Sequence, residues 1–154
     1  MAVVRILVDG YSLLHAWQDL APEAPRHSAR AREALIRVLT QYADSSGTPV
    51  TLFFDGAGGP KDAPKNISSD SLEIVFSRDS KTADDLIERT AYRLKPYGEA
   101  LAVTNDYAER DTVISMGGLA QSCEDFIKDI ERAFNERDDF LKQYNRREAN
   151  RYKR

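Results

Sequence analysis

Short apolar runs alternate with longer amphipathic segments along this chain, and the two patterns predict different elements. Runs rich in β-branched and other apolar residues predict buried strands over 3–8, 49–54, 72–76 and 100–104. Apolar residues at helical spacing predict a helix over 28–43, a second over 82–94, and a last helix that starts near Ser122. The run 112–114 predicts an additional short strand at an edge of the sheet. Strands and helices therefore alternate along most of the chain.

One segment, from 56 to 71, breaks this alternation. It is rich in Gly, Pro, Ser and Asp and has no apolar period, so it predicts a surface loop. The alternation elsewhere indicates right-handed βαβ units, and therefore a three-layer α/β/α domain with a mainly parallel central sheet. In such folds, ligands bind outside the carboxyl ends of the strands, where the strand order reverses. We expect the functional residues at that edge.

Composition narrows the class of protein further. A chain of 154 residues is long enough for one domain with a core of its own. Its single cysteine, Cys123, excludes an internal disulfide and a zinc cluster built from thiolates. No apolar run approaches the roughly 18 residues of a membrane span, and the apolar start of the chain is too short for a signal peptide. We therefore expect a cytoplasmic protein without a membrane partner.

Charge is distributed unevenly along the chain. The formal net charge of −3 argues against a protein that coats nucleic acid through its overall field. Residues 137–154 nevertheless hold seven basic and three acidic side chains, a net charge of +4. We expect one domain over residues 1–135, followed by a basic helical extension or tail over 136–154.

Acidic residues gather at the predicted carboxyl edge of the sheet. Asp9 follows the first strand directly, Asp55 follows the second, and Asp106 lies two residues beyond the fourth. The helix after the third strand carries Asp84 in its first turn, and Glu88 lies one turn later on the same face. Clustered carboxylates repel one another unless a cation neutralises them or they share protons. Oxygen ligands favour Mg²⁺ or Mn²⁺, ions that activate water for phosphodiester hydrolysis.

Each of these acids also has a structural interpretation. An aspartate after a strand is a common turn former, and Asp55 fits this role because a glycine follows it. The spacing of Thr82 and Asp85 matches a capping box, which leaves Asp84 as the better metal ligand of the neighbouring pair. Glu88 has nearby cations with which it can pair instead.

Four blocks of the sequence resemble one known family. Asp9-Gly10-Tyr11-Ser12-Leu13-Leu14-His15 resembles the opening motif of the NYN domains, relatives of the PIN-domain nucleases, and specifically of their YacP-like group. Three further blocks match this group in the same order, over 53–56, 76–88 and 103–122. The resemblance covers about residues 3–135 and implies a PIN-like fold.

The resemblance also implies an activity and a set of site residues. It implies an endoribonuclease that cleaves single-stranded RNA, in which Asp9, Asp84 and Asp106 bind Mg²⁺ or Mn²⁺. Glu88 and Asp55 are further acidic candidates, Glu88 for catalysis and Asp55 for metal binding. The alternative is an RNA-binding module that keeps the fold without cleaving. A phosphohydrolase of the haloacid-dehalogenase type is disfavoured, because such enzymes have Asp-x-Asp after the first strand.

Several polar residues are expected to meet the RNA. NYN domains usually carry asparagine where this chain has Ser12, whose shorter side chain is expected to orient a phosphate more weakly. Two lysines of the predicted loop, Lys61 and Lys65, and two basic residues before the second helix, Arg78 and Lys81, are placed to contact phosphates. The glycines of the loop lack the Lys-Ser/Thr of a P-loop, so no nucleotide cofactor is expected.

Overall fold

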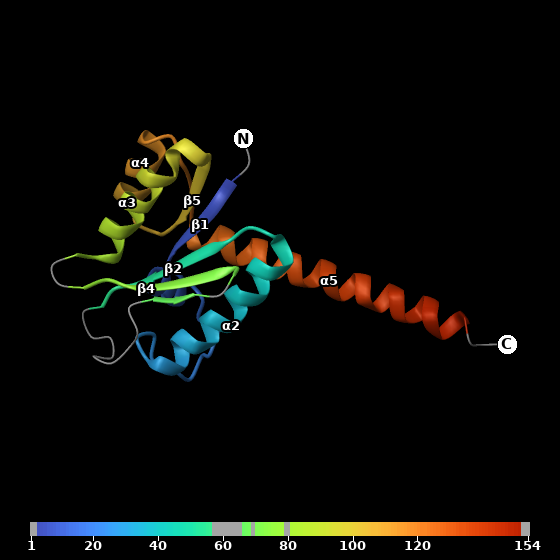
Figure 1. Cartoon of the computed structure of the whole chain (residues 1–154). Helices are drawn as coiled ribbons and strands as arrows, with labels where there is room; N and C mark the ends of the chain where they lie inside the picture. The colour runs from blue at the N-terminus through green and yellow to red at the C-terminus, as the bar shows by residue number, and fades with distance from the viewer. Residues whose placement is uncertain (1–2, 57–65, 69, 79–80, 152–154) are drawn as a thin grey trace.

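One sheet forms the centre of the molecule, and helices cover both of its faces (Figure 1). The structure is a computed structural model that describes residues 3–56, 66–68, 70–78 and 81–151. Its strands are β1 (Val3–Asp9), β2 (Val50–Phe54), β3 (Asn66–Ser68), β4 (Leu72–Phe76), β5 (Glu99–Val103) and β6 (Leu119–Gln121). Its helices are α1 (Gly10–Ala16), α2 (Ala29–Ser46), α3 (Ala83–Leu94), α4 (Tyr107–Ser115) and α5 (Cys123–Arg151), with a 3₁₀ turn, η1, at Lys95–Tyr97.

The order of the strands creates a switch point at the centre of the sheet. The order is β3-β4-β2-β1-β5-β6, in which β3 runs antiparallel to β4 and the other pairs are parallel. From β1 the chain adds β2 and β4 on one side and β5 and β6 on the other, so the direction reverses between β1 and β5. The register pairs Asp9 with Phe53 and Val8 with Val103, so the carboxyl ends of these three strands lie level. This confirms the predicted three-layer fold with a mainly parallel sheet.

The apolar runs of the strands are continuous because both faces of the sheet are buried. On one face, Ile6 and Val8 of β1 belong to a cluster that includes buried residues of α1, α2 and α5. On the other face, Leu7 packs in a cluster with Ile87 of α3 and Val113 of α4. Alternate residues of the same strand therefore serve two separate cores.

One prediction about local structure is wrong, and a second is contradicted over three residues. The residues 112–114, predicted as an edge strand, belong to α4, where Val113 is fully buried. The side chain of Asp106 accepts hydrogen bonds from the backbone N–H groups of Ala108 and Glu109, and this cap starts a helix despite the β-branched run. The segment 56–71 is not wholly irregular, because 66–68 form β3 against β4. Lys61 and Lys65 lie outside the described residues.

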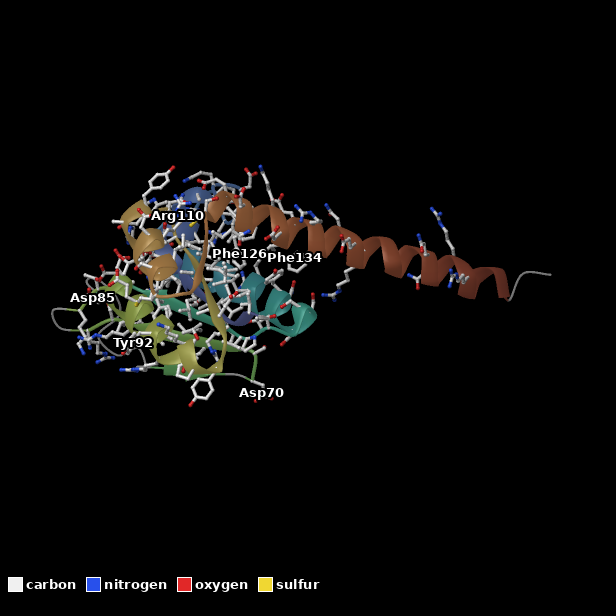
Figure 2. All side chains as sticks on the ribbon, turned by 90° about the horizontal axis from the view of Figure 1, so that it is seen from above. Asp70, Asp85, Tyr92, Arg110, Phe126 and Phe134 are labelled. Carbon is white, nitrogen blue, oxygen red and sulfur yellow. The ribbon has the colours of Figure 1, made fainter. Side chains whose placement is uncertain are left out.

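The last helix, α5, runs without interruption to Arg151. Phe126 and Ile130 are buried and Phe134 packs partly against the core, so the first part of α5 covers the sheet (Figure 2). The remainder of α5 projects away from the sheet and its covering helices (Figure 1). Among the helices of the described residues, none has the length and apolar content that crossing a membrane requires.

Both Asp-Gly pairs that follow strands have a packing reason for their glycine. A Cβ on Gly10 would lie 2.4 Å from a ring carbon of Phe54, whose side chain is fully buried. A Cβ on Gly56 would lie 1.8 Å from the backbone carbonyl oxygen of Ser77. At both positions, immediately after the acids that end β1 and follow β2, the chain therefore leaves no room for a Cβ.

Substitution of Gly56 by alanine is expected to lower the free energy of unfolding by about 1–2 kcal/mol, because the obstructing atom belongs to the backbone and cannot rotate away. The comparison is Gly47→Ala, where φ is +75° but nothing lies within 4 Å of the new Cβ, so that only backbone strain of about 1 kcal/mol is expected. Urea unfolding measures both. A smaller loss for Gly56→Ala than for Gly47→Ala would contradict this account of the close approach.

Candidate metal centre at the carboxyl edge of the sheet

Three carboxylates from three elements meet at the switch point. Asp9 ends β1, Asp84 lies in the first turn of α3, and Glu109 lies in the first turn of α4. Each offers one carboxylate oxygen such that all three oxygens lie within 4.8 Å of one another. The topology therefore brings together side chains that are far apart in the sequence, at the edge where ligands bind in this class of fold.

Helix caps form beside two of these acids, and Asp9 is itself one of the caps. The Asp9 side chain caps α1 and accepts a hydrogen bond from the backbone N–H of Ser12 at 3.3 Å. In α3, the Thr82 hydroxyl accepts from the N–H of Asp85, and the Asp85 carboxylate accepts from the N–H of Thr82, both at 3.2 Å. This confirms the predicted capping box. Asp84 takes no part in the cap, so its carboxylate is available to the cluster.

Glu109 is the least solvated member of the cluster, with only 2% of its surface exposed. Among the residues that the structure describes, neither of its carboxylate oxygens has a hydrogen-bond partner. Burial, then the nearby carboxylate of Asp84, then the charge of Asp9, raise the pKa of Glu109 to about 9. Thr104 lies near enough to lower this pKa in part, although its hydroxyl does not reach either oxygen with hydrogen-bond geometry. Without a cation, this environment therefore favours the protonated form of Glu109.

The other acids of the edge respond to the same environment. Burial is the main reason that the pKa of Asp9 is raised to about 6, and the charges of Asp84 and Asp55 add to the rise. The hydrogen bond from the backbone N–H of Ser12 lowers this pKa in part. Burial also raises the pKa of Glu88, with smaller contributions from three neighbouring carboxylates. The edge therefore disfavours the accumulation of negative charge.

The cluster fits a hard divalent cation. A buried carboxylate without donors costs free energy unless it is protonated or meets a cation, and here two further carboxylates point to the same place. All three donors are oxygens, which suits Mg²⁺ or Mn²⁺ better than zinc or copper. Among the described residues, Asp9, Asp84 and Glu109 therefore form a group that could hold a metal ion.

The structure brings together only part of the set predicted from the sequence. Asp9 and Asp84 lie in the cluster, whereas Asp106 is exposed, caps α4, and lies outside the group of oxygens within 4.8 Å. Asp55 accepts a hydrogen bond from the Ser77 hydroxyl at 3.4 Å and affects Asp9 through its charge. Asp55 and Glu88 both interact electrostatically with members of the cluster without belonging to it.

Glu109 was not among the predicted ligands, although one signal could have identified it. It lies three residues after Asp106, the position at which an acid commonly completes a capping box. The sequence interpretation assigned no helix there. Recognition of α4 would have placed Asp106 as the cap and Glu109 as a second acid in the same helical turn.

Ser12 is engaged within the protein. Its hydroxyl accepts a hydrogen bond from the backbone N–H of Asn105 at 3.1 Å, and the thiol of Cys123 lies 3.6 Å away. The Asn105 side chain in turn accepts from the N–H of Cys123 at 2.8 Å. Ser12 thus ties α1 to the loop after β5 and to the start of α5.

Burial raises the pKa of the Cys123 thiol to about 11, so this thiol stays protonated and packs as a core residue.

Basic residues are close in sequence to Asp84 and Glu88. Arg78 and Lys81 are exposed in the connection between β4 and α3, a few residues before Asp84.

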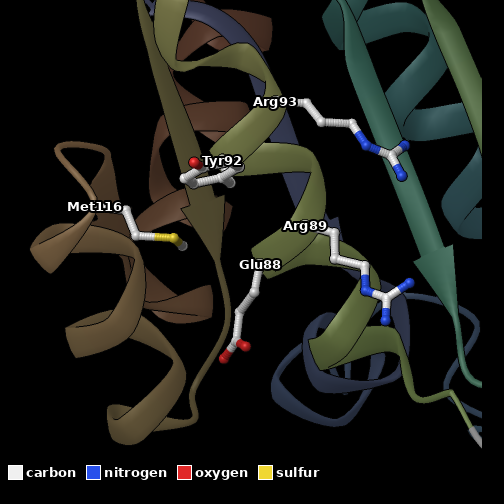
Figure 3. Close-up of a pocket in the computed structure, with 5 residues that line it drawn as sticks. All are labelled: Glu88, Arg89, Tyr92, Arg93 and Met116. Atoms are coloured by element: carbon white, nitrogen blue, oxygen red, sulfur yellow. The ribbon is translucent and has the colours of Figure 1, made fainter.

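A pocket lies further along α3 and is lined by Glu88, Arg89, Tyr92, Arg93 and Met116 (Figure 3). Figure 3 shows Glu88 and Tyr92 on the side of α3 that faces Met116, while Arg89 and Arg93 point away from it.

Comparison with known proteins identifies relatives over most of the chain. The sequence pattern of the YacP-like NYN domain family matches residues 6–154, a range that includes the basic C-terminal stretch. The uncharacterized protein YacP of Bacillus subtilis (strain 168) is 30% identical over 127 residues, which cover 82% of this chain and 74% of YacP.

Solved structures agree with this match. The crystal structure of Rae1 (YacP) from Bacillus subtilis superposes with a TM-score of 0.76 at 25% sequence identity, over 97% of this chain and 84% of Rae1. The structure of its W164L mutant gives the same TM-score and identity over 92% of this chain and 82% of that one.

Proposed function

Because this chain belongs to the YacP-like NYN domain family, we propose that it is a divalent-metal-dependent endoribonuclease that hydrolyses phosphodiester bonds of single-stranded RNA. The observation that carries the proposal is the buried carboxylate of Glu109, without a hydrogen-bond partner among the described residues and within 4.8 Å of Asp9 and Asp84. Relationship to PIN-like nucleases supports a nuclease-like function in general terms. The carboxylate cluster supports the specific, metal-dependent form.

In this proposal, Asp9, Asp84 and Glu109 would hold Mg²⁺ or Mn²⁺, which when bound would supply Lewis-acid polarisation of the phosphodiester and activation of water at neutral pH. All three carboxylates must be ionised to act as ligands, so Glu109 would have to give up the proton that its raised pKa favours. Asp55 and Asp106 are proposed as further metal-binding acids at the rim. Glu88, whose pKa is raised by burial and by neighbouring carboxylates, is proposed to exchange protons beside the reacting phosphate.

Basic side chains are proposed to position the RNA. Arg78 and Lys81 precede the helix that carries Asp84, where they can neutralise phosphates that flank the scissile one. Lys61 and Lys65 have the same proposed role on the basis of sequence alone. Ser12 is proposed to act on the RNA through the loop after β5, whose backbone it holds.

A cleavage assay on end-labelled single-stranded RNAs of mixed sequence tests this function. Cleavage is expected with Mn²⁺ or Mg²⁺, none with EDTA, and a marked loss for Asp9→Asn and Asp84→Asn. The matched control is Asp111→Asn, which removes an exposed carboxylate from α4. Cleavage in EDTA, or undiminished cleavage by Asp9→Asn, would overturn the metal mechanism. Tight RNA binding without cleavage by the unmodified protein would favour a non-catalytic RNA-binding module.

A further inference from the structure

A second pocket opens at the start of α4. It has a volume of about 510 Å³ and is lined by Asn105, Tyr107, Arg110, Ser122 and Glu124. These residues come from the loop after β5, the first turns of α4, and the start of α5. The pocket therefore lies at the same carboxyl edge of the sheet as the acids.

One of the side chains that line this pocket is a highly exposed aromatic ring. Tyr107 is 77% exposed, although large aromatic side chains usually bury most of their surface. The guanidinium of Arg110, one helical turn later, lies 4.3 Å from the centre of the Tyr107 ring. The Nε of Arg110 is buried and has no hydrogen-bond partner among the described residues. A planar cation and a planar ring are thus held together at the surface, next to the start of α4.

Tyr107 and Arg110 are connected to the acids through short links. Tyr107 and Arg110 alternate along α4 with Asp106, which caps the helix, and Glu109, which joins the carboxylate cluster. The N–H of Asn105 donates to Ser12, and the N–H of Ser12 donates to Asp9. Figure 2 shows Arg110 at the same end of the molecule as the start of α3, far from the free end of α5. A nucleotide bound at the pocket would be close to one whose phosphate lies at the acids.

We propose that Tyr107 and Arg110 form a stacking platform for a nucleobase of the bound RNA, adjacent to the phosphate that is cleaved. Single-stranded RNA is recognised by stacking of splayed bases on aromatic rings and guanidinium planes, which is the surface that this pair presents. The inference rests on the proposed function, because the ligand is the RNA substrate of the same site.

Arg110 and Glu124 bring opposite charges to the pocket. The Glu124 carboxylate accepts a hydrogen bond from the side-chain amide of Asn105 at 3.0 Å. It offsets the attraction of Arg110 for a phosphate, and it can accept a hydrogen bond from the exocyclic amino group of a base. The Asn105 side chain is fixed at both ends, by Glu124 and by the N–H of Cys123, so the rim is already ordered.

Tyr107→Ala is the direct test, measured with a single-stranded RNA that carries 2-aminopurine, a base whose fluorescence falls on stacking. In EDTA, the full chain is expected to bind this RNA and to quench the probe. Tyr107→Ala is expected to bind about tenfold more weakly and to lose the quenching, because one base stack is removed. Tyr107→Phe, which keeps the ring, is expected to behave like the unmodified protein.

The matched control is Tyr97→Ala. Tyr97 is equally exposed, at 78%, but it lies in η1 beyond the far end of α3 from Asp84, so its loss is expected to leave binding and quenching unchanged. Equal binding and quenching by Tyr107→Ala and the unmodified protein would overturn the platform while leaving the ribonuclease proposal intact. Failure of the unmodified protein both to bind the RNA in EDTA and to cleave it with Mn²⁺ would overturn both proposals.

Discussion

Replacement of Glu109 by glutamine is expected to slow cleavage of single-stranded RNA by about 100-fold or more while the protein stays folded. Glutamine has nearly the same shape as glutamate, so the core around α4 keeps its packing. It cannot supply an ionised oxygen to the group in which one oxygen each of Asp9, Asp84 and Glu109 lie within 4.8 Å of one another. The expected loss therefore reflects the metal site alone, and a single-turnover cleavage assay with Mn²⁺ measures it.

Two variants on the same helix make this result interpretable. Asp111→Asn removes an exposed charge from α4 and is expected to keep activity within about twofold. Asp106→Asn preserves the helix cap, because asparagine caps as well as aspartate, so it separates the capping role from the metal-binding role predicted from the sequence. A full loss in Asp106→Asn together with normal activity in Glu109→Gln would show that the sequence-based choice of ligand is correct.

Without metal, the protein is expected to lose stability as the pH rises from about 5 to about 8. The folded state raises the pKa of Glu109 from 4.5 to about 9 and that of Asp9 from 3.8 to about 6. In this range the folded protein keeps protons that the unfolded chain has released. By linkage, the free energy of unfolding falls by up to about 1.4 kcal/mol per pH unit for each such proton.

Urea unfolding in EDTA at several pH values, on the unmodified protein and Glu109→Gln, measures this effect. Glutamine has no proton to release, so the stability difference between the two proteins is expected to change with pH in favour of the variant at high pH. Saturating Mn²⁺ is expected to reverse the trend, because the ion binds the ionised carboxylates. Parallel curves for the two proteins in EDTA would mean that Glu109 ionises normally in the folded protein.

The elements that the sequence predicted well are those with strong local signals. The strands β1, β2, β4 and β5 are continuous apolar runs, because a central parallel sheet is buried on both faces. The capping box of Thr82 and Asp85 is a local hydrogen-bond pattern, so the sequence alone could predict that Asp85 caps the helix and that Asp84 is available to the carboxylate cluster.

The error at α4 carried through to the site. The run 112–114 has the composition of a strand, and only the packing of Val113 against the sheet, together with the Asp106 cap, makes it helical. Asp106 and Glu109 have the same spacing as Thr82 and Asp85, yet Glu109 turns into the interior whereas Asp85 caps its helix. That difference depends on the tertiary neighbours of each helix, which the local sequence does not specify. The three-residue strands β3 and β6 are likewise too short to show an alternating pattern.

Calorimetric titration of the full chain with Mn²⁺ tests the metal centre most directly. The unmodified protein and Asp111→Asn are expected to bind the ion saturably, with a measured enthalpy that depends on the buffer because protons are released. Glu109→Gln is expected to bind at least about tenfold more weakly. Equal affinity in Glu109→Gln and the unmodified protein, or no binding by the unmodified protein, would contradict a metal centre formed by Asp9, Asp84 and Glu109.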